Sequence, residues 1–241
     1  MITSAIAAGI ATITFVDCSP LSRGDADFAR EMIECIRDAS DEDDVKAIIL
    51  RASGRDFCPV LPQEEAAAAT RIDRGLTSDW RGVFASARGI YQSLCFSRKV
   101  TIAEVRGDCG AAGTLLTLCA GLAVADENAS FECPFGSLPE ANFVLAALTI
   151  RLNRAKAWSL RGQSLDARTA AAAGLVNRVV SARDLQAEVE SMGKRIVKMP
   201  LDGIAISKII LESCLDTQGV GREFDAVPFY GMAFQQEANA S

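Results

Sequence analysis

The sequence contains no histidine, although it is 241 residues long. Histidine is the usual general base for a serine or cysteine nucleophile and the commonest nitrogen ligand for metals. Its absence excludes a Ser-His-Asp or Cys-His catalytic pair and an imidazole metal site. Carboxylates, lysine, tyrosine and backbone dipoles are left to carry any chemistry.

The sequence also lacks paired cysteines and clusters of basic residues. Its eight cysteines form no Cys-x-x-Cys pair, and several stand in apolar runs, which is typical of reduced, buried cytoplasmic thiols rather than of a disulfide framework or a zinc site. The net charge of -6 is spread without long blocks, which argues against a nucleic-acid or anionic-membrane surface. The acidic run 41–44 is most simply a solvated loop, so we assign no metal ligands.

Long hydrophobic runs are missing as well. The longest uncharged run, 109–125, is interrupted by Gly and Thr and is too short for a comfortable membrane span. The first residues lack the basic region and apolar stretch of a signal peptide. We therefore expect a cytoplasmic protein with no membrane span and no nucleic-acid partner.

What is present is enough apolar surface for a sizeable core, since 49% of the residues are hydrophobic. Residues 10–16 alternate with period two, and Ala8-Gly9 before them predicts a tight hairpin from the opening residues. Residues 25–40 have the apolar spacing of an amphipathic helix, and residues 45–50 form a continuous apolar strand. This β-α-β order predicts an α/β domain with a parallel sheet.

The most informative stretch is 99–126, which reads as strand, glycine-bearing loop, buried helix and strand. The loop 106–113 is rich in small residues, the helix follows over 114–120, and Gly121 is placed to end it. A helix that begins in such a loop offers free N–H groups and the positive end of its dipole to an incoming oxygen. Close packing of the helix against the sheet explains the same pattern, and neither a Gly-x-Gly-x-x-Gly fingerprint nor a P-loop is present.

Helices and strands continue along the rest of the chain. We expect helices over 81–94, 156–160, 165–173, 182–199 and 200–215, and strands over 129–133 and 175–180. Another helix is expected to begin within 134–141, which would put Glu140 near the favourable end of its dipole. For 63–80 a mobile lid and a packed helix both stay open.

Four stretches in combination resemble the crotonase (enoyl-CoA hydratase/isomerase) superfamily. They are the strand 102–107 with its Val-x-Gly end, the turn 111–113, the segment 125–131 and the segment 171–180. The resemblance implies an α/β fold built as a spiral of β-β-α units with a C-terminal helical region. It places a crotonase core over 1–185 and a trimerisation region over 186–241, in a homotrimer or a hexamer of two trimers.

The resemblance also implies an acyl-CoA thioester substrate, with coenzyme A as part of the substrate and no permanently bound cofactor. Two backbone N–H groups of such proteins stabilise the enolate of the thioester. By position these would be the N–H groups of Ala112 and Leu61, and the carbonyl contacts to adenine would fall near Cys58 and Pro59. The loop departs from the family's Ala-Gly-x-Asp, because 59–62 is Pro-Val-Leu-Pro here.

The acid-base residues point to a subclass. Leu115 and Phe135 stand where hydratases carry their two glutamates. The segment 134–141 resembles instead the delta-3,delta-2-enoyl-CoA isomerase branch, whose single glutamate sits in a Pro-Glu-Gly or Pro-Glu-Ala step, although about three residues before that step are missing. Glu140 would remove a proton from C2 and return it at C4.

Other interpretations stay open. The protein could run another crotonase-type reaction on a CoA or carrier thioester (hydration or dehydration, decarboxylation, hydrolysis), or be a catalytically silent CoA-binding member. Glu140 could simply stabilise a helix N-terminus. Glu104 lies within the central strand, and its carboxylate could be buried and paired or could point outward. Alternation along the strand 129–133 puts Glu132 on the face opposite to Phe131. The remaining, weaker candidates are Asp108, Tyr91, Tyr230 and Cys109.

Overall fold

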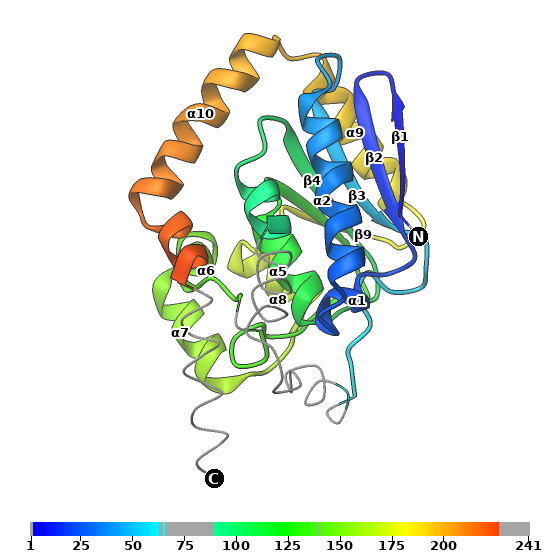
Figure 1. Ribbon diagram of the computed structural model, residues 1–241. Helices are drawn as coiled ribbons and strands as arrows, with labels where there is room; N and C mark the ends of the chain where they lie inside the picture. Colours follow the sequence, from blue (N-terminus) through cyan, green and yellow to red (C-terminus); the bar gives the residue numbers. More distant parts are fainter. Residues whose placement is uncertain (1, 63–64, 66–88, 139, 227–241) are drawn as a thin grey trace.

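The computed structural model describes residues 2–62, 65, 89–138 and 140–226 (Figure 1). A six-stranded sheet forms its centre, in the order β1-β2-β3-β4-β6-β9. β1 pairs antiparallel with β2, and every other neighbouring pair is parallel. The strands are β1 (Ile2–Ala7), β2 (Ile10–Phe15), β3 (Ala47–Ala52), β4 (Val100–Val105), β6 (Leu122–Asp126) and β9 (Arg178–Val180). The α/β class and the parallel sheet predicted from the sequence are confirmed.

A second, smaller sheet has three short strands: β5 (Asp108–Cys109), β7 (Ser130–Phe131) and β8 (Leu165–Asp166). β5 comes directly after β4, and β7 comes directly after β6, so the chain twice passes from the large sheet to the small one before it enters a helix. These are two successive β-β-α turns. They give the fold the spiral of β-β-α units that the family resemblance implied.

Helices cover both faces of the large sheet. The helices labelled in Figure 1, of which α10 lies apart from the sheet, are α1 (Ser19–Ser22), α2 (Ala26–Asp41), α5 (Ala111–Cys119), α6 (Phe143–Ile150), α7 (Leu152–Arg161), α8 (Ala167–Ala173), α9 (Leu185–Val197) and α10 (Leu201–Thr217). Alternate residues of β3 belong to two hydrophobic clusters: Ile48 packs with the cluster that contains α2, and Ile49 with the cluster that contains α9. β3 is thus buried on both faces, as a central parallel strand must be.

α10 lies at the edge of the molecule, away from the sheet (Figure 1). Its large apolar side chains are more than half exposed at Ile206 (58%), Ile209 (64%), Ile210 (58%) and Leu211 (58%). Within the described ranges no helix combines the length and apolar character needed to cross a membrane.

Several local predictions are confirmed. The β1–β2 hairpin turns at Ala8 and Gly9, whose φ angles are 50° and 77°. The amphipathic helix expected over 25–40 is α2, Ala26–Asp41. Gly174 ends α8 in the left-handed conformation.

Other predictions need correction or lie outside the described residues. The helix expected to begin within 134–141 begins at Phe143, because Asn142 caps it by accepting a hydrogen bond from the N–H of Leu145 at 2.8 Å. Residues 165–166 form β8 instead of helix, since they pair with β7. Residues 89–95 are helical as expected. The expectations for 63–64, 66–80 and 81–88 lie outside the described residues.

Candidate functional site

The N-terminus of α5 is built by tight backbone turns. Gly107 has a φ of 56°, and Gly110 precedes the helix and accepts its first hydrogen bond, from the N–H of Thr114 at 2.9 Å. A Cβ at Gly113 would lie 2.5 Å from the Cβ of Cys58. Small residues are therefore required for the close approach of the 57–58 segment, as one of the two sequence readings held. In the first helical turn the N–H groups of Ala112 and Gly113 donate to no acceptor among the described residues, so the alternative interpretation as an oxyanion site stays a prediction.

The loop that follows β3 runs alongside this turn. The N–H of Phe57 donates to the carbonyl of Arg106 at 2.8 Å, and the N–H of Cys58 donates to Asp108 at 3.0 Å. The N–H of Gly110 donates back to the carbonyl of Cys58 at 2.6 Å. These bonds fix the start of the 58–62 loop against the end of α5 that carries Ala112.

Ala112 is fully buried and stands at the second position of α5. Leu61 is half-buried, three residues beyond the point where Cys58 pairs with Cys109. The structure thus brings the loop that contains Leu61 to the helix end that contains Ala112. That their two N–H groups bind one oxygen stays a prediction, as do adenine contacts near Cys58 and Pro59.

Glu140 is buried, with 7% of its surface exposed. Burial raises the pKa of its carboxyl to about 7, and a hydrogen bond from its own backbone N–H partly opposes that rise. Within the described residues no other side chain forms a hydrogen bond or an ion pair with Glu140. The fully buried Tyr91 lies close enough that the charge of Glu140 adds to the effect of burial in raising the pKa of its phenol.

The N-terminus of α6 does not use Glu140. Asn142 caps it, and the carboxylate of Glu223 accepts hydrogen bonds from the N–H groups of Phe143 and Val144 at 2.9 and 2.8 Å. The amide of Asn142 also donates to the carbonyl of Val220 at 3.0 Å. The stabilising role that the sequence left open for Glu140 is thus filled by two other side chains.

Glu132 is a site residue that sequence reasoning missed. Its Oε2 accepts a hydrogen bond from the N–H of Ala111 at 2.8 Å, at the first position of α5. Alternation along β7 correctly directs Glu132 away from the buried Phe131, but that direction leads to the helix end. The order of elements carried a signal for this, because β7 pairs with β5 and β5 immediately precedes α5.

The weaker candidates have other roles. Glu104 is fully buried and forms ion pairs with Arg51 at 2.7 Å and Arg106 at 2.9 Å, so it is the paired carboxylate that one reading predicted. Asp108 is exposed. Burial raises the pKa of the Cys109 thiol, which makes it a poor nucleophile. Tyr230 lies outside the described residues.

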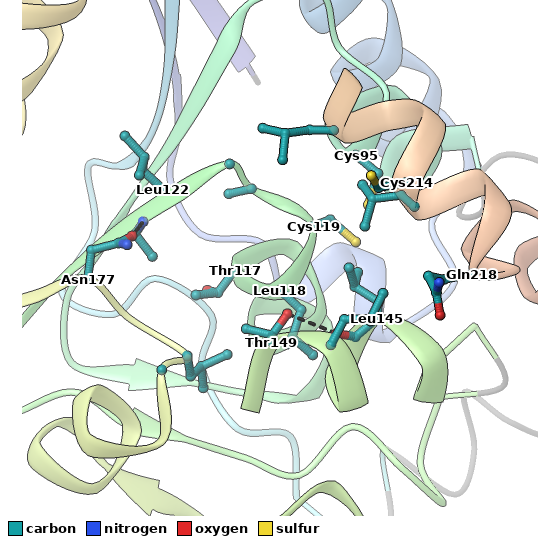
Figure 2. Close-up of a pocket in the computed structure, with 18 of the residues that line it drawn as sticks. Cys95, Thr117, Leu118, Cys119, Leu122, Leu145, Thr149, Asn177, Cys214 and Gln218 are labelled. Atoms are coloured by element: carbon teal, nitrogen blue, oxygen red, sulfur yellow. Dashed lines mark hydrogen bonds between the residues drawn. The ribbon is translucent and has the colours of Figure 1, made fainter. Parts of the chain in front are cut away.

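A cavity of about 380 Å³ lies at the other end of α5 (Figure 2). Its lining comes from residues 117–123, from α6 and α10, and from Cys95. Thr149 closes one side and donates a hydrogen bond to the carbonyl of Leu145 at 2.8 Å. A nine-residue helix is about 13 Å long, so this cavity is separate from the Ala112 end. In the part of the chain that the structure describes, no group of histidine, cysteine and carboxylate side chains is arranged to hold a metal ion.

Comparison with known proteins places this chain in a family. The enoyl-CoA hydratase/isomerase family matches residues 5–238, so the chain belongs to that family. The 4-chlorobenzoyl coenzyme A dehalogenase-2 of an Arthrobacter species is 28% identical over 221 residues, covering 86% of this chain and 79% of the relative. The 1,2-epoxyphenylacetyl-CoA isomerase of Escherichia coli K12 is 24% identical over 232 residues, covering 90% and 85%.

Among solved structures, an enoyl-CoA hydratase/isomerase from Xanthobacter autotrophicus Py2 superposes with a TM-score of 0.80 at 26% identity, covering 96% of this chain and 86% of that one. The enoyl-CoA hydratase of Bacillus halodurans has the same fold, with a TM-score of 0.74 at 19% identity over 95% of this chain and 94% of that one. The named relatives carry out several reactions, so membership establishes the family and leaves the reaction to the residues of the site.

Proposed function

We propose that this protein is an enoyl-CoA isomerase-like enzyme that shifts a double bond in an acyl-CoA thioester. Glu140 is its single base, and the backbone N–H groups of Ala112 and Leu61 hold the thioester oxygen. Coenzyme A arrives as part of the substrate, and the reaction needs no permanently bound cofactor. The proposal rests on family membership together with the environment of Glu140.

The observation that carries the proposal is a buried carboxylate that has no side-chain partner in the part of the chain that the structure describes. Glu140 is 7% exposed, and the α6 terminus that it could have stabilised is satisfied by Asn142 and Glu223. A carboxyl with a pKa of about 7 can both accept and donate a proton near neutral pH. Perturbed carboxyls of this kind are concentrated at catalytic sites.

The chemistry follows from one base and one oxyanion site. N–H donors on the thioester oxygen acidify the C2–H bond of a 3-enoyl thioester, and the carboxylate of Glu140 takes that proton. The electron pair of the C2–H bond moves into the enolate, whose charge rests on the held oxygen. The same carboxyl returns the proton to C4, and the double bond moves from C3–C4 to C2–C3. Atoms and charge balance without another reactant.

The two positions of the hydratase glutamates support isomerisation over hydration. Leu115 is fully buried, and Phe135 stacks on Phe143 with ring centroids 4.1 Å apart and meets Trp158 edge-on at 5.9 Å. Both positions serve packing. Neither side chain can activate or orient a water molecule, so the two positions that carry the hydratase glutamates cannot serve the addition of water here.

Proton exchange tests the proposal directly. In deuterated buffer the wild-type protein should exchange the C2 hydrogens of butyryl-CoA and convert 3-hexenoyl-CoA to the 2-enoyl isomer. The Glu140→Gln variant should lose about 10²- to 10⁴-fold in both rates, the usual contribution of a general base, while its affinity for butyryl-CoA is kept. Glu127→Gln, the same change at an exposed site, is the matched control. Unchanged exchange in Glu140→Gln would remove Glu140 from the mechanism.

The similarity to a dehalogenase and the match to the enoyl-CoA hydratase/isomerase family favour a second candidate, another reaction at the same thioester site. The same preparations should be offered crotonyl-CoA, with loss of enoyl absorbance as the readout, and 4-chlorobenzoyl-CoA, with chloride release as the readout. Turnover of either, with no exchange at C2, would replace isomerisation. Failure to bind any CoA ester would identify a family member without the activity.

We also propose that the exposed apolar face of α10 packs against other copies of the chain in a homotrimer, or in a hexamer of two trimers. Three of its four exposed large side chains are isoleucines on a surface that a monomer would leave in water. Light scattering on the purified protein should give a mass three or six times 25.6 kDa. Ile209→Glu with Ile210→Glu should shift that mass toward the monomer, and a wild-type monomer would overturn the proposal.

A further inference from the structure

Glu132 lies where three parts of the proposed oxyanion site converge. Its Oε2 is 2.8 Å from the N–H of Ala111. A Cβ placed on Gly110 would lie 3.4 Å from that same oxygen, 3.1 Å from the carbonyl oxygen of Pro59 and 3.2 Å from that of Cys58. The carboxylate of Glu132 and two loop carbonyls therefore surround the backbone that leads into Ala112.

This arrangement decides which N–H groups of α5 face a ligand. The first helical N–H, at Ala111, is occupied by Glu132, and the N–H of Thr114 is occupied by Gly110. Ala112 and Gly113 lie between them, and no hydrogen bond from their N–H groups is present within the described residues. Glu132 thereby leaves Ala112 as the first open donor of the helix.

The same carboxylate puts negative charge beside that donor. The amide groups of Ala111 and Ala112 are neighbours along the chain, with Cα atoms about 4 Å apart. A thioester oxygen bound at Ala112, and the acyl carbons next to it, would therefore lie within several ångströms of Glu132. At such distances, in a partly buried site, like charges repel appreciably. No positive side chain contacts Glu132 within the described residues, so nothing there offsets its charge.

We propose that Glu132 is a specificity-determining residue that rejects acyl groups bearing a second carboxylate and favours uncharged ones. This inference rests on the proposed function, because it assumes that a thioester oxygen binds at Ala112. A terminal carboxylate on a short acyl chain attached to that thioester would lie within range of the negative charge of Glu132. An alkyl or alkenyl chain of the same length carries no such cost.

Binding of two matched thioesters tests the inference without requiring turnover. Butyryl-CoA and succinyl-CoA both carry four acyl carbons, and only the second has a terminal carboxylate. We expect calorimetry on the wild-type protein to show succinyl-CoA binding at least 10-fold more weakly than butyryl-CoA. Glu132→Gln keeps an oxygen that can accept from Ala111 and removes the charge, so it should reduce that ratio to about 3-fold or less while butyryl-CoA affinity changes little.

Two controls separate the possible failures. Glu127→Gln removes the same charge from an exposed position a few residues earlier and should leave the ratio as in wild type. Equal binding of the two thioesters by wild-type protein, or an unchanged ratio in a folded Glu132→Gln variant, overturns the role of Glu132 and leaves the proposed function intact. Absence of binding by either thioester overturns the proposed function itself, and this inference with it.

Discussion

The two ends of α5 differ in chemistry although every residue of the helix is buried. At the N-terminal end, glycine turns and the 58–62 loop surround free backbone N–H groups. At the C-terminal end a cavity of about 380 Å³ is lined mainly by apolar side chains and thiols. Helix N-termini present donors and positive potential, whereas C-termini present carbonyls and negative potential.

This difference teaches that open space and reactivity need not coincide. The cavity at the Cys119 end is roomy, but α5 presents carbonyl oxygens there and no N–H donors of its first turn. The Ala112 end is tightly packed, yet it is there that backbone N–H groups could receive negative charge on a thioester oxygen, as the proposed function requires. The polarity of the helix selects the end at which the proposed chemistry occurs.

The largest expected effect is on proton exchange, and it should differ between a change in the proposed site and a change in the cavity at the C-terminal end of α5. Glu140→Gln should lower proton exchange about 10²- to 10⁴-fold, whereas Leu148→Ala, which enlarges the cavity at the other end, should stay within about threefold of wild type. Exchange at C2 of butyryl-CoA is the measurement for both variants. If Leu148→Ala caused the greater loss, the site would have to be moved to the cavity end.

A second expected effect concerns stability and pH. The folded protein holds Glu140 with a pKa raised from 4.5 to about 7, so it binds a proton more tightly than the unfolded chain does. The stability that this proton supplies is fully present below about pH 4.5 and is lost as pH rises to about 7. The loss amounts to about 3 kcal/mol.

Urea unfolding of wild type and Glu140→Gln at pH values from 4.5 to 8 measures this effect. Titration of other groups contributes equally to both proteins, so the difference between them isolates Glu140. Wild type should lose about 3 kcal/mol relative to the variant over that range. Parallel curves would mean that Glu140 is not buried in the folded state.

A smaller effect, on stability and binding, is expected from a packing change at the N-terminal end of α5. Gly113→Ala would place a Cβ 2.5 Å from the Cβ of Cys58 and 3.0 Å from the Sγ of Cys109, so the loop must move away. We expect a loss of about 1–3 kcal/mol together with weaker butyryl-CoA binding. Gly203→Ala in α10 meets no atom within 4 Å and should gain up to about 1 kcal/mol. Thermal unfolding and calorimetry on both variants check the contrast.

Local pattern was sufficient for several parts of the fold. Period-two alternation and the Ala8-Gly9 turn predicted the β1–β2 hairpin, and the spacing of apolar residues predicted α2. The small residues of 106–113 predicted the tight turn that leads into α5. These features depend on interactions within a few residues, so the sequence alone contains what determines them.

Long-range contacts decided the environment of Glu140. The start of α6 depends on Asn142, whose side-chain amide donates to the carbonyl of Val220, and on the carboxylate of Glu223, which accepts from the N–H of Val144. Val220 and Glu223 lie far from α6 along the chain. A local reading could not see these partners, so it began the helix early and left Glu140 as a helix-stabilising residue among the alternatives.

By itself, then, the sequence determined the order of strands and helices, the turn before α5 and the resemblance to the family, because backbone propensities and side-chain periodicity act locally. Tertiary structure alone decided that Glu132 meets Ala111 and that Glu140 is buried without a side-chain partner among the described residues. Alternation tells which way a side chain points, whereas what it meets there depends on how distant elements pack.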